Sequence, residues 1–274
     1  MLTQAQTTAS VAGHFGEWMQ GRHGSDGPVV LVTLPCPLLF VRAVWVQAGE
    51  LEVDWSGSPL IASSQAARLV GELGLPNGKV SLESNMAPAR GTGASTAALV
   101  ALAQAAGASD PEAIARACIA VEGASDPLML PHPDRVLWAP RRGQVLRELP
   151  SPPAFDVIGG FFGDDQVTDP ADDKFPDITD LIPIWESAAA RGDRSALADC
   201  AMASAQRTTA LRGPANDPTQ DLCQALGALG WVRAHTGSAR ALVFAPNTVP
   251  VGAEERLRAS GLRDVLRFRT GVAA

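Results

Sequence analysis

Lysine is nearly absent from this 274-residue chain, and no block of basic residues occurs anywhere in it. Lys and Arg number 22 against 29 Asp and Glu, a net charge of −7, and the only lysines are Lys79 and Lys174. An acidic chain without a basic patch binds a phosphate backbone poorly, so no nucleic-acid partner is expected. Neither lysine stands in a Gly-x-x-x-x-Gly-Lys-Ser/Thr pattern, which excludes a Walker-type phosphate loop.

Cysteine is also scarce, and its spacing excludes several kinds of site. The four cysteines show neither a Cys-x-x-Cys pattern nor the Cys/His spacing of a zinc site; they are Cys36, Cys118, Cys200 and Cys223. The first 16 residues contain no Lys, Arg, Asp or Glu, so the charged start of a secretory signal is missing. The longest uncharged stretch, residues 91–109, is rich in Ala, Gly, Ser and Thr and too polar to span a membrane. We therefore expect a cytoplasmic protein with reduced thiols and no membrane partner.

The remaining composition predicts an α+β protein with a sizeable core. Hydrophobic residues make up 46% of the chain, enough for one large domain or two modest ones. The Pro-rich segment 150–153 predicts a boundary between an N-terminal domain, residues 1–150, and a C-terminal domain, residues 151–274. The helical patterns are grouped rather than alternating regularly with strands, as in the α+β class. Strand patterns occupy residues 29–46, 79–84, 135–138, 145–149, 155–158, 231–234, 240–245 and 265–269; helical patterns occupy 65–73, 94–106, 111–122, 182–191, 194–209, 221–229 and 253–259.

A glycine-rich loop that runs directly into a helix is the most informative segment. Residues 88–96 read Pro-Ala-Arg-Gly-Thr-Gly-Ala-Ser-Thr, and an Ala/Leu helix follows. Glycines at 91 and 93 allow backbone N–H groups to point inward, and the helix start adds unpaired N–H groups and a partial positive charge. This combination suits a polyphosphate, and the alternative is an ordinary turn with a Ser/Thr cap. The predicted nucleotide-binding residues are Pro88, Arg90, Gly91, Thr92, Gly93, Ala94, Ser95 and Thr96.

Several motifs together resemble one family of enzymes. The loop resembles the Pro-x-x-x-Gly-Leu-Gly-Ser-Ser-Ala-Ala phosphate loop of the GHMP kinases, a group that includes galactokinase, homoserine kinase and mevalonate kinase. Residues 13–21, Gly-His-Phe-Gly-Glu-Trp-Met-Gln-Gly, are similar to the first family motif, in the Cys-Gly-Glu-Leu-x-Gln-Gly form of the L-threonine kinases of cobalamin biosynthesis. Residues 234–238, Ala-His-Thr-Gly-Ser, resemble the third motif, and residues 204–207 resemble a Ser/Gln-Arg stretch of the threonine kinases. The motifs occur in the family order and span nearly the whole chain.

The resemblance implies a fold, a reaction and cofactors. The fold is the two-domain GHMP kinase fold, with the phosphate loop at a helix N-terminus. The reaction is the ATP- and Mg²⁺-dependent phosphorylation of the L-threonine hydroxyl to O-phospho-L-threonine. Two rivals remain: a GHMP kinase for homoserine or an isoprenoid alcohol, and an ATP-binding sensor without turnover.

The sequence departs from the threonine kinases at three places. His14-Phe15 stand where Ser-Cys is usual, and Ala94 replaces the first serine of the loop. Residues 122–127, Glu-Gly-Ala-Ser-Asp-Pro, stand where the subfamily has Glu-Pro-Thr-Asp-Ser. The Ser-Asp-Pro order is instead similar to the Ser-Gly-x-Asp-Pro stretch of mevalonate kinases.

Specific residues follow from the motifs. Ser95 and Glu122 are expected to share the magnesium ion; Glu122 ends a helix, where a negative charge opposes the helix dipole, and its alternative role is a solvated surface charge. Ser95 and Asp126 are the catalytic candidates, Asp126 accepting the hydroxyl proton unless it only forms an Asp-Pro turn. The substrate candidates are Glu17, Gln20, Arg207 and His235; the alternative for Glu17, Gln20 and His235 is a structural role. Arg207 is expected to hold the substrate carboxylate through its planar fork, the alternative being a helix-surface arginine. Residues 164–180, with seven Asp, predict a solvated loop rather than a metal site.

Overall fold

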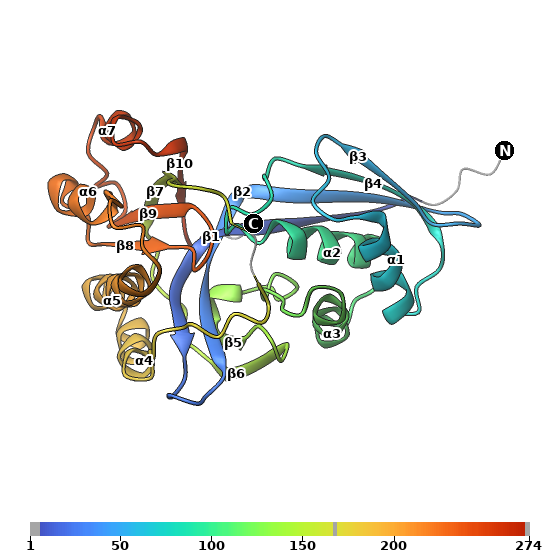
Figure 1. The fold of residues 1–274 in the computed structure, drawn as a ribbon, viewed down its shortest axis with the longest axis horizontal. Helices are drawn as coiled ribbons and strands as arrows, with labels where there is room; N and C mark the ends of the chain where they lie inside the picture. Colours follow the sequence, from blue (N-terminus) through green and yellow to red (C-terminus); the bar gives the residue numbers. More distant parts are fainter. Residues whose placement is uncertain (1–5, 167–168, 272–274) are drawn as a thin grey trace.

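The computed structural model describes residues 6–166 and 169–271 of the chain, and these residues form ten strands and seven α-helices (Figure 1). The strands are β1 (Gln6–Arg22), β2 (Val29–Gln47), β3 (Glu52–Ser56), β4 (Gly78–Ser84), β5 (Val136–Ala139), β6 (Gln144–Glu148), β7 (Asp156–Phe161), β8 (Gly230–Arg233), β9 (Ala239–Phe244) and β10 (Arg263–Arg269). The helices are α1 (Ser63–Glu72), α2 (Ala94–Ala105), α3 (Pro111–Glu122), α4 (Leu181–Arg191), α5 (Arg194–Arg212), α6 (Thr219–Leu226) and α7 (Ala253–Ala259). A short 3-10 helix, η1 (Pro133–Arg135), precedes β5.

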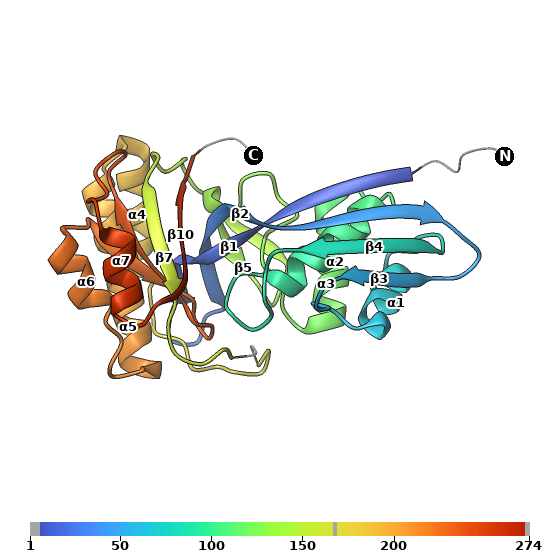
Figure 2. The ribbon, with the colours of Figure 1, turned by 90° about the horizontal axis from the view of Figure 1, so that it is seen from above.

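All ten strands belong to one sheet. Its main path runs β10-β7-β9-β8-β1-β2-β4-β3, and β5 pairs with β2 and with β6 beside that path. The named strand pairs are antiparallel except for β3 and β4, which are parallel. Strands β1 and β2 are 17 and 19 residues long, and Figures 1 and 2 show them passing through the middle of the molecule. The combination of a largely antiparallel sheet with grouped helices confirms the predicted α+β class.

The sheet joins two halves of the chain. In Figure 1, α1–α3, β3 and β4 lie on one side and β7–β10 with α4–α7 on the other, while β1 and β2 extend from one side into the other. The Pro-rich segment 150–153 falls between β6 and β7, which is where the sequence places the domain boundary. The sheet itself is continuous across the halves because β8 pairs with β1, where Glu17 faces Arg233. A ligand bound along β1 therefore contacts residues of both halves.

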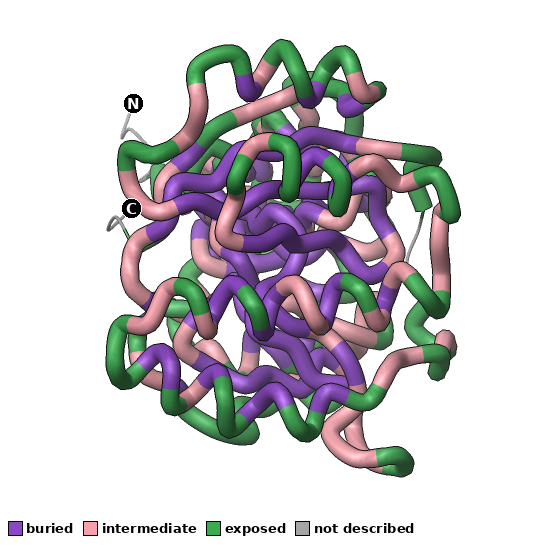
Figure 3. The backbone as a smooth tube through the Cα atoms, turned by 90° about the vertical axis from the view of Figure 1, so that its left-hand side faces the viewer, coloured by how far each residue is buried: buried purple, intermediate pink, exposed green. Residues whose placement is uncertain are grey.

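The interior is filled by apolar side chains from both halves. Helix α2 is buried on almost every face and packs on β1 and β2, which explains its Ala-rich sequence. Trp18 and Trp185 are fully buried with their rings 5.6 Å apart, and they join β1 to α4. Figure 3 shows the buried segments in the interior and the exposed ones along the outer turns of the helices. All four cysteines are buried and free, which agrees with the predicted reduced thiols.

Element boundaries follow local sequence signals in the N-terminal half. Asp110 caps α3, accepting a hydrogen bond from the backbone N–H of Glu112 at 3.0 Å, and Gly123 ends the helix in the left-handed region at φ 81°. Strand β2 continues through Pro35 and Pro37. A proline has no N–H for the ladder, and the pairing is irregular here: β1 advances one residue from Ala12 to Gly13 while its partner in β2 changes from Phe40 to Cys36, so residues 37–39 of β2 are left unpaired.

Two further register shifts add residues to β1 and shape the site described below. The register between β1 and β2 shifts between Ala12 and Gly13, between His14 and Glu17, and between Glu17 and Met19. In a regular strand, residues 14 and 17 would point to opposite faces, because side chains alternate with a period of two. The shifts allow both His14 and Glu17 to face the same pocket.

Within the described residues, no helix is both long enough and apolar enough to cross a membrane.

Candidate active site

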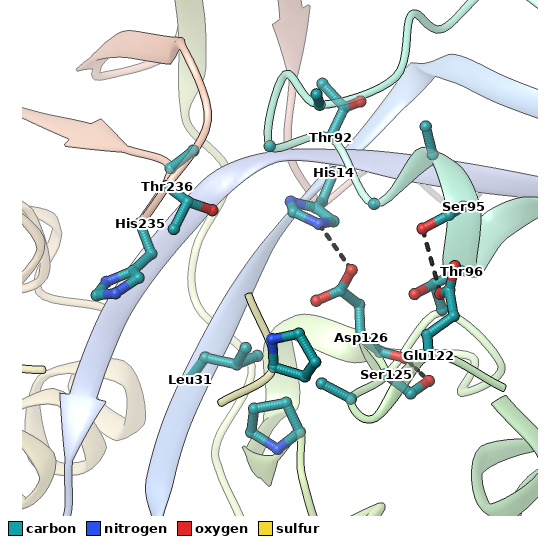
Figure 4. A pocket seen from close by; sticks show the side chains of 18 of the residues that line it. His14, Leu31, Thr92, Ser95, Thr96, Glu122, Ser125, Asp126, His235 and Thr236 are labelled. Atoms are coloured by element: carbon teal, nitrogen blue, oxygen red, sulfur yellow. Dashed lines mark hydrogen bonds and ion pairs between the residues drawn. The ribbon is translucent and has the colours of Figure 1, made fainter. Parts of the chain in front are cut away.

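A pocket of about 470 Å³ lies between the glycine-rich loop and the long strands (Figure 4). This volume is typical of a small-molecule site. Its walls come from β1 and β2, from residues 88–96 and 122–126, from the turn after β5, from the segment around residues 166–175 and from residues 234–236. The view in Figure 4 shows Asp126 at the centre, Ser95 and Glu122 on one side, and His235 on the other.

The glycine-rich loop directs its carbonyl groups into the protein. The carbonyl of Gly91 accepts from the N–H of Gly16 at 3.3 Å, and the carbonyl of Thr92 accepts from the N–H of His14 at 3.0 Å. No side chain of the described residues caps α2, and the residues at its start, Gly93 to Thr96, line the pocket. An uncapped helix start with its neighbouring carbonyls turned away is a ready site for an anion.

Two positions in this loop require glycine. Gly91 has φ 74° and Gly93 has φ 67°, both in the left-handed region that disfavours other residues. A Cβ on Gly93 would lie 2.5 Å from Cδ2 of the His14 ring, and a Cβ on Gly91 would lie 2.3 Å from Cβ of Ala234. Any side chain here would push the loop away from β1 and from the 234–236 turn.

Ser95 and Glu122 meet at the start of α2 and the end of α3. The Ser95 hydroxyl donates to Oε2 of Glu122 at 3.2 Å, and Gln65 of α1 donates to Oε1 at 3.3 Å. Burial raises the pKa of Glu122 to about 7. A half-buried carboxylate beside a hydroxyl is an oxygen donor pair of the kind that Mg²⁺ takes in proteins, so these residues fit the predicted ion.

His14 lies between two carboxyl groups. Its Nε2 is 3.3 Å from Oδ2 of Asp126, and its Nδ1 is 3.4 Å from Oε1 of Glu17. Burial lowers the pKa of His14, but the two carboxyl groups outweigh it and raise the value to about 9. Burial raises the pKa of Glu17, and the charge on His14 opposes that rise and favours the carboxylate. Asp126 is therefore held by a side chain that the sequence motifs did not mark as functional.

The far end of the pocket is aromatic and cationic. Phe175 stacks on His235 with ring centroids 3.7 Å apart and an interplanar angle of 3°. The Arg141 guanidinium lies 5.6 Å from the Phe175 centroid and donates to the backbone carbonyl of Asp172. Burial and the nearby charge of Arg212 lower the pKa of His235 to about 3, so its ring is neutral.

Gln20 adds a free acceptor to this end. Its side-chain Oε1 is buried without a hydrogen-bond partner among the described residues. Its backbone is fixed by Ser204 of α5, which accepts from the Gln20 N–H at 2.9 Å and donates to the Gln20 carbonyl at 3.3 Å. The stretch at residues 204–207 that resembles threonine kinases therefore supports the pocket through its serine.

Arg207 lies elsewhere, and this corrects the expectation for it. Every other predicted site residue lines the pocket, whereas Arg207 is absent from its described lining. Its two terminal nitrogens lie 2.6 and 2.7 Å from the Asp180 carboxylate, and one donates to the carbonyl of Asp177 at 2.7 Å. Ser204 and Arg207 are on the same helix, but Ser204 faces β1 and Arg207 faces the segment before α4. The guanidinium fork that was expected to take a substrate carboxylate is already occupied.

Arg90 lines the pocket but is also held by other contacts. Its guanidinium lies 3.3 Å from Asp165 and 2.6 Å from Asp264, and 4.7 Å from the centroid of Phe161. These contacts fasten the glycine-rich loop to the C-terminal half.

The acidic segment 164–180 is a largely exposed loop, as predicted, in its described residues, which exclude 167–168; some of its side chains also reach the site. Asp165 and Asp172 pair with arginines, and Gln166, Asp169 and Phe175 line the pocket. Sequence reasoning also missed His14 and Arg141 as pocket residues. His14 gave a signal, since it replaces a serine in the first motif; Arg141 and Phe175 gave none, since only the fold brings their segments here.

Comparison with known proteins places the fold. No protein-family model and no curated protein sequence matches the chain. Among solved structures, the mevalonate kinase of Leishmania major in complex with R-mevalonate matches with a TM-score of 0.65 and 13% identity, covering 97% of each chain. The homoserine kinase of Cytophaga hutchinsonii matches with a TM-score of 0.65 and 13% identity, covering 99% of this chain and 97% of that one. The phosphomevalonate kinase of Streptococcus pneumoniae matches with a TM-score of 0.65 and 11% identity, covering 98% and 100%.

These similarities establish the fold of the GHMP kinases for this chain over nearly its whole length. At such low identity they do not establish what the chain binds or which reaction it catalyses.

Proposed function

We propose that this protein is an ATP-dependent kinase of a small hydroxy amino acid, with L-threonine as its acceptor. The observation that carries the proposal is the order of groups along one pocket. An uncapped helix start, the Ser95–Glu122 pair, the Asp126 carboxyl group and a cationic end with Arg141 all line it. A phosphoryl transfer needs an anion site, a metal site, a proton acceptor and an acceptor site in one cleft.

The nucleotide end is the glycine-rich loop with α2. The N–H groups at the start of α2 would hold phosphate oxygens, and Ser95 and Glu122 would hold Mg²⁺. When bound, the ion would neutralise charge that develops on the transferred phosphoryl group. The resemblance of residues 88–96 to the family phosphate loop supports ATP as the donor.

Asp126 is the group that would take the acceptor proton. The acceptor O–H bond breaks as its oxygen bonds to the γ-phosphorus, and the bond to ADP breaks with its electron pair remaining on ADP. The proton passes to the Asp126 carboxylate, whose other contact is with His14. Two observations support this role: Asp126 lines the pocket together with Ser95 and Glu122, and its charge contributes to raising the pKa of Glu122.

The acceptor end suits an amino acid. A carboxylate would be taken by Arg141, which has no carboxylate within 4.0 Å in the described part of the chain, whereas Arg207 is paired with Asp180. An ammonium group would be taken by the free Oε1 of Gln20. The aromatic surface of Phe175 beside Arg141 would limit the length of the acceptor.

L-Threonine is favoured by the motif resemblance of residues 13–21 and 234–238, which also implies that O-phospho-L-threonine serves cobalamin biosynthesis. Homoserine is the second candidate, because it offers the same charged groups and one structural neighbour is a homoserine kinase. An isoprenoid alcohol such as mevalonate lacks the ammonium group that Gln20 would accept.

An ADP-release screen over L-threonine, L-serine, L-homoserine, mevalonate and galactose tests the proposal. We expect L-threonine to give the highest kcat/KM, with mevalonate and galactose near background. If mevalonate were the only acceptor to give ADP release, the protein would be a kinase of an isoprenoid alcohol. ATP binding without ADP release for any acceptor would favour the sensor.

A further inference from the structure

The contacts of His14 decide where its protons are. Nδ1 lies 3.2 Å from the carbonyl oxygen of Gly16 as well as 3.4 Å from Glu17. A carbonyl oxygen only accepts hydrogen bonds, so Nδ1 must carry a proton. In the neutral ring, Nε2 is then an acceptor and would face Oδ2 of Asp126, at 3.3 Å, with no proton between them unless Asp126 supplied it.

A carboxylate that is to act as a base cannot supply that proton. The proton between Nε2 and Oδ2 must then belong to His14, which makes the ring an imidazolium with a donor on each nitrogen. Nε2–H holds Oδ2 of Asp126, and the second carboxylate oxygen is left for the acceptor hydroxyl. The contact between His14 and Asp126 therefore exists in its productive form only while the ring is charged.

We infer that His14 is a positioning residue for the transfer, an imidazolium that orients Asp126 toward the acceptor hydroxyl, and that Glu17 holds His14 in this charged form. This inference rests on the proposed function for its reaction. During transfer the acceptor proton moves to the free oxygen of Asp126, and His14 keeps both of its ring protons. The residue that departs from the subfamily motif thus has a defined part in the site.

The surroundings of the ring support this assignment. Among the described residues, the charged groups facing His14 are Glu17, from its own strand, and Asp126, from the loop after α3. The glycine-rich loop packs against the ring through the backbone at Gly93, which adds no charge. Both carboxyl groups raise the pKa of His14, which reaches about 9, so the ring is charged at neutral pH and loses its proton only as the pH rises through that value.

Nitrogen NMR of protein labelled in its four histidines tests the charge without any substrate. The His14 signals are identified by their loss in His14→Gln, with exposed His132→Gln as the matched control. We expect both ring nitrogens of His14 to show imidazolium shifts at pH 7.5 and to titrate near pH 9. In Glu17→Gln the titration should move down by about one unit, because an opposite charge nearby raises a histidine pKa by roughly that much.

Kinetics provide the second arm. Wild-type kcat should fall as the pH rises through about 9, because His14 loses its proton there. His14→Gln keeps an N–H donor near the position of Nε2 at every pH, so the basic limb should disappear while kcat falls about 10-fold from lost charge. His14→Leu has no donor, and kcat should fall about 100-fold, as for a misplaced catalytic group. In Glu17→Gln the pH at which kcat falls should decrease by the same amount as the pKa of His14 measured by NMR.

Three results would overturn the inference. The first is a neutral His14 ring at pH 7.5, and the second is a His14 titration that Glu17→Gln leaves unchanged. The third is binding of one Zn²⁺ by the nucleotide-free wild type but not by His14→Gln, because the atoms of His14, Glu17 and Asp126 lie close enough to hold an ion and would then be a metal site. If the acceptor screen finds no substrate, the NMR arm still decides the state of His14, so failure of the proposed function is a separate result.

Discussion

Ser95, in the first turn of α2, donates its hydroxyl proton to Glu122, the last residue of α3, at 3.2 Å. A glutamate at a helix C-terminus opposes the helix dipole, and this one is also largely withdrawn from water. This position destabilises the charged form of Glu122. It also brings the oxygens of Ser95 and Glu122 together at the start of α2, beside the anion site. Unfavourable placement of this kind is typical of residues kept for binding rather than for folding.

If Ser95 and Glu122 hold the same magnesium ion, the loss of kcat in the double variant should be smaller than the product of the two single losses. Ser95→Ala and Glu122→Gln should each lower kcat about 100-fold, and the double variant should lose much less than the product of the two. The measurement is a double-mutant cycle of kcat at saturating ATP with varied Mg²⁺. Fully multiplicative losses would show that the residues do not serve one ion.

The buried charge also predicts a pH-dependent stability. The pKa of Glu122 rises from 4.5 to about 7, so the stabilisation of its protonated form is complete below about pH 4.5 and is lost as the pH rises through 7. Glu122→Gln keeps a neutral side chain, so without Mg²⁺ it should be more stable than wild type at pH 8, by at most roughly 3 kcal/mol at 1.36 kcal/mol per pKa unit.

Thermal unfolding in EDTA measures this difference. Near pH 4.5 the Tm of Glu122→Gln should match that of wild type, and at pH 8 it should be higher by about 5 °C. Glu148→Gln, at an exposed position, is the control, and its Tm should match that of wild type at both pH values. A lower Tm for Glu122→Gln at pH 8 would contradict the burial argument.

The glycine-rich loop gives a prediction for nucleotide affinity. Gly93→Ala forces a side chain into the left-handed region and toward the His14 ring, so the loop must move and ATP affinity should fall at least about 10-fold. Gly107→Ala is the matched control, because Gly107 also has a positive φ, 107°, but open space around its Cβ position. Equal ATP affinity in the two variants, measured by calorimetry, would remove the loop from the nucleotide site.

Variants of Arg141 and Arg207 show which of the two arginines binds the acceptor carboxylate. A charge-assisted hydrogen bond is worth about 1.5–3 kcal/mol, so Arg141→Gln should lower kcat/KM for L-threonine about 10- to 150-fold. Arg207→Gln removes the pair with Asp180 and the hydrogen bond to the Asp177 carbonyl, neither of which involves a residue of the pocket lining, and should change kcat/KM by less than about 3-fold. L-Threoninol, which lacks the carboxylate, should be insensitive to Arg141→Gln. The reverse pattern, with Arg207→Gln the damaging change, would restore the sequence-based assignment.

Local chemistry made much of the fold predictable. The caps of α3, the glycines of the loop and the alternation in β4 depend on neighbouring residues, so they are visible in the sequence. The long strand β1 was less visible, because its register shifts break the alternation at His14 and Glu17. Those shifts are what bring the two side chains to one pocket.

Contacts between distant segments limit what the sequence can show of the site. Ser95 and Glu122 were paired through the motifs, but the contact of His14 with Asp126 spans 112 positions and depends on how β1 meets the loop after α3. Arg207 was placed by motif resemblance alone, and nothing in the sequence shows that Asp180 occupies its fork. Arg141 and Phe175 reach the pocket only because the segment 164–180 runs along its far end.

Product identification by phosphorus NMR tests the central claim most directly. Wild-type protein is incubated with ATP, Mg²⁺ and L-threonine, with Asp126→Asn as the matched variant. We predict that O-phospho-L-threonine forms in equal amount to ADP, and that Asp126→Asn slows its formation by about 10²- to 10⁴-fold. ADP accompanied only by inorganic phosphate, or an equal rate in Asp126→Asn, would contradict a kinase in which Asp126 takes the proton of a hydroxy amino acid.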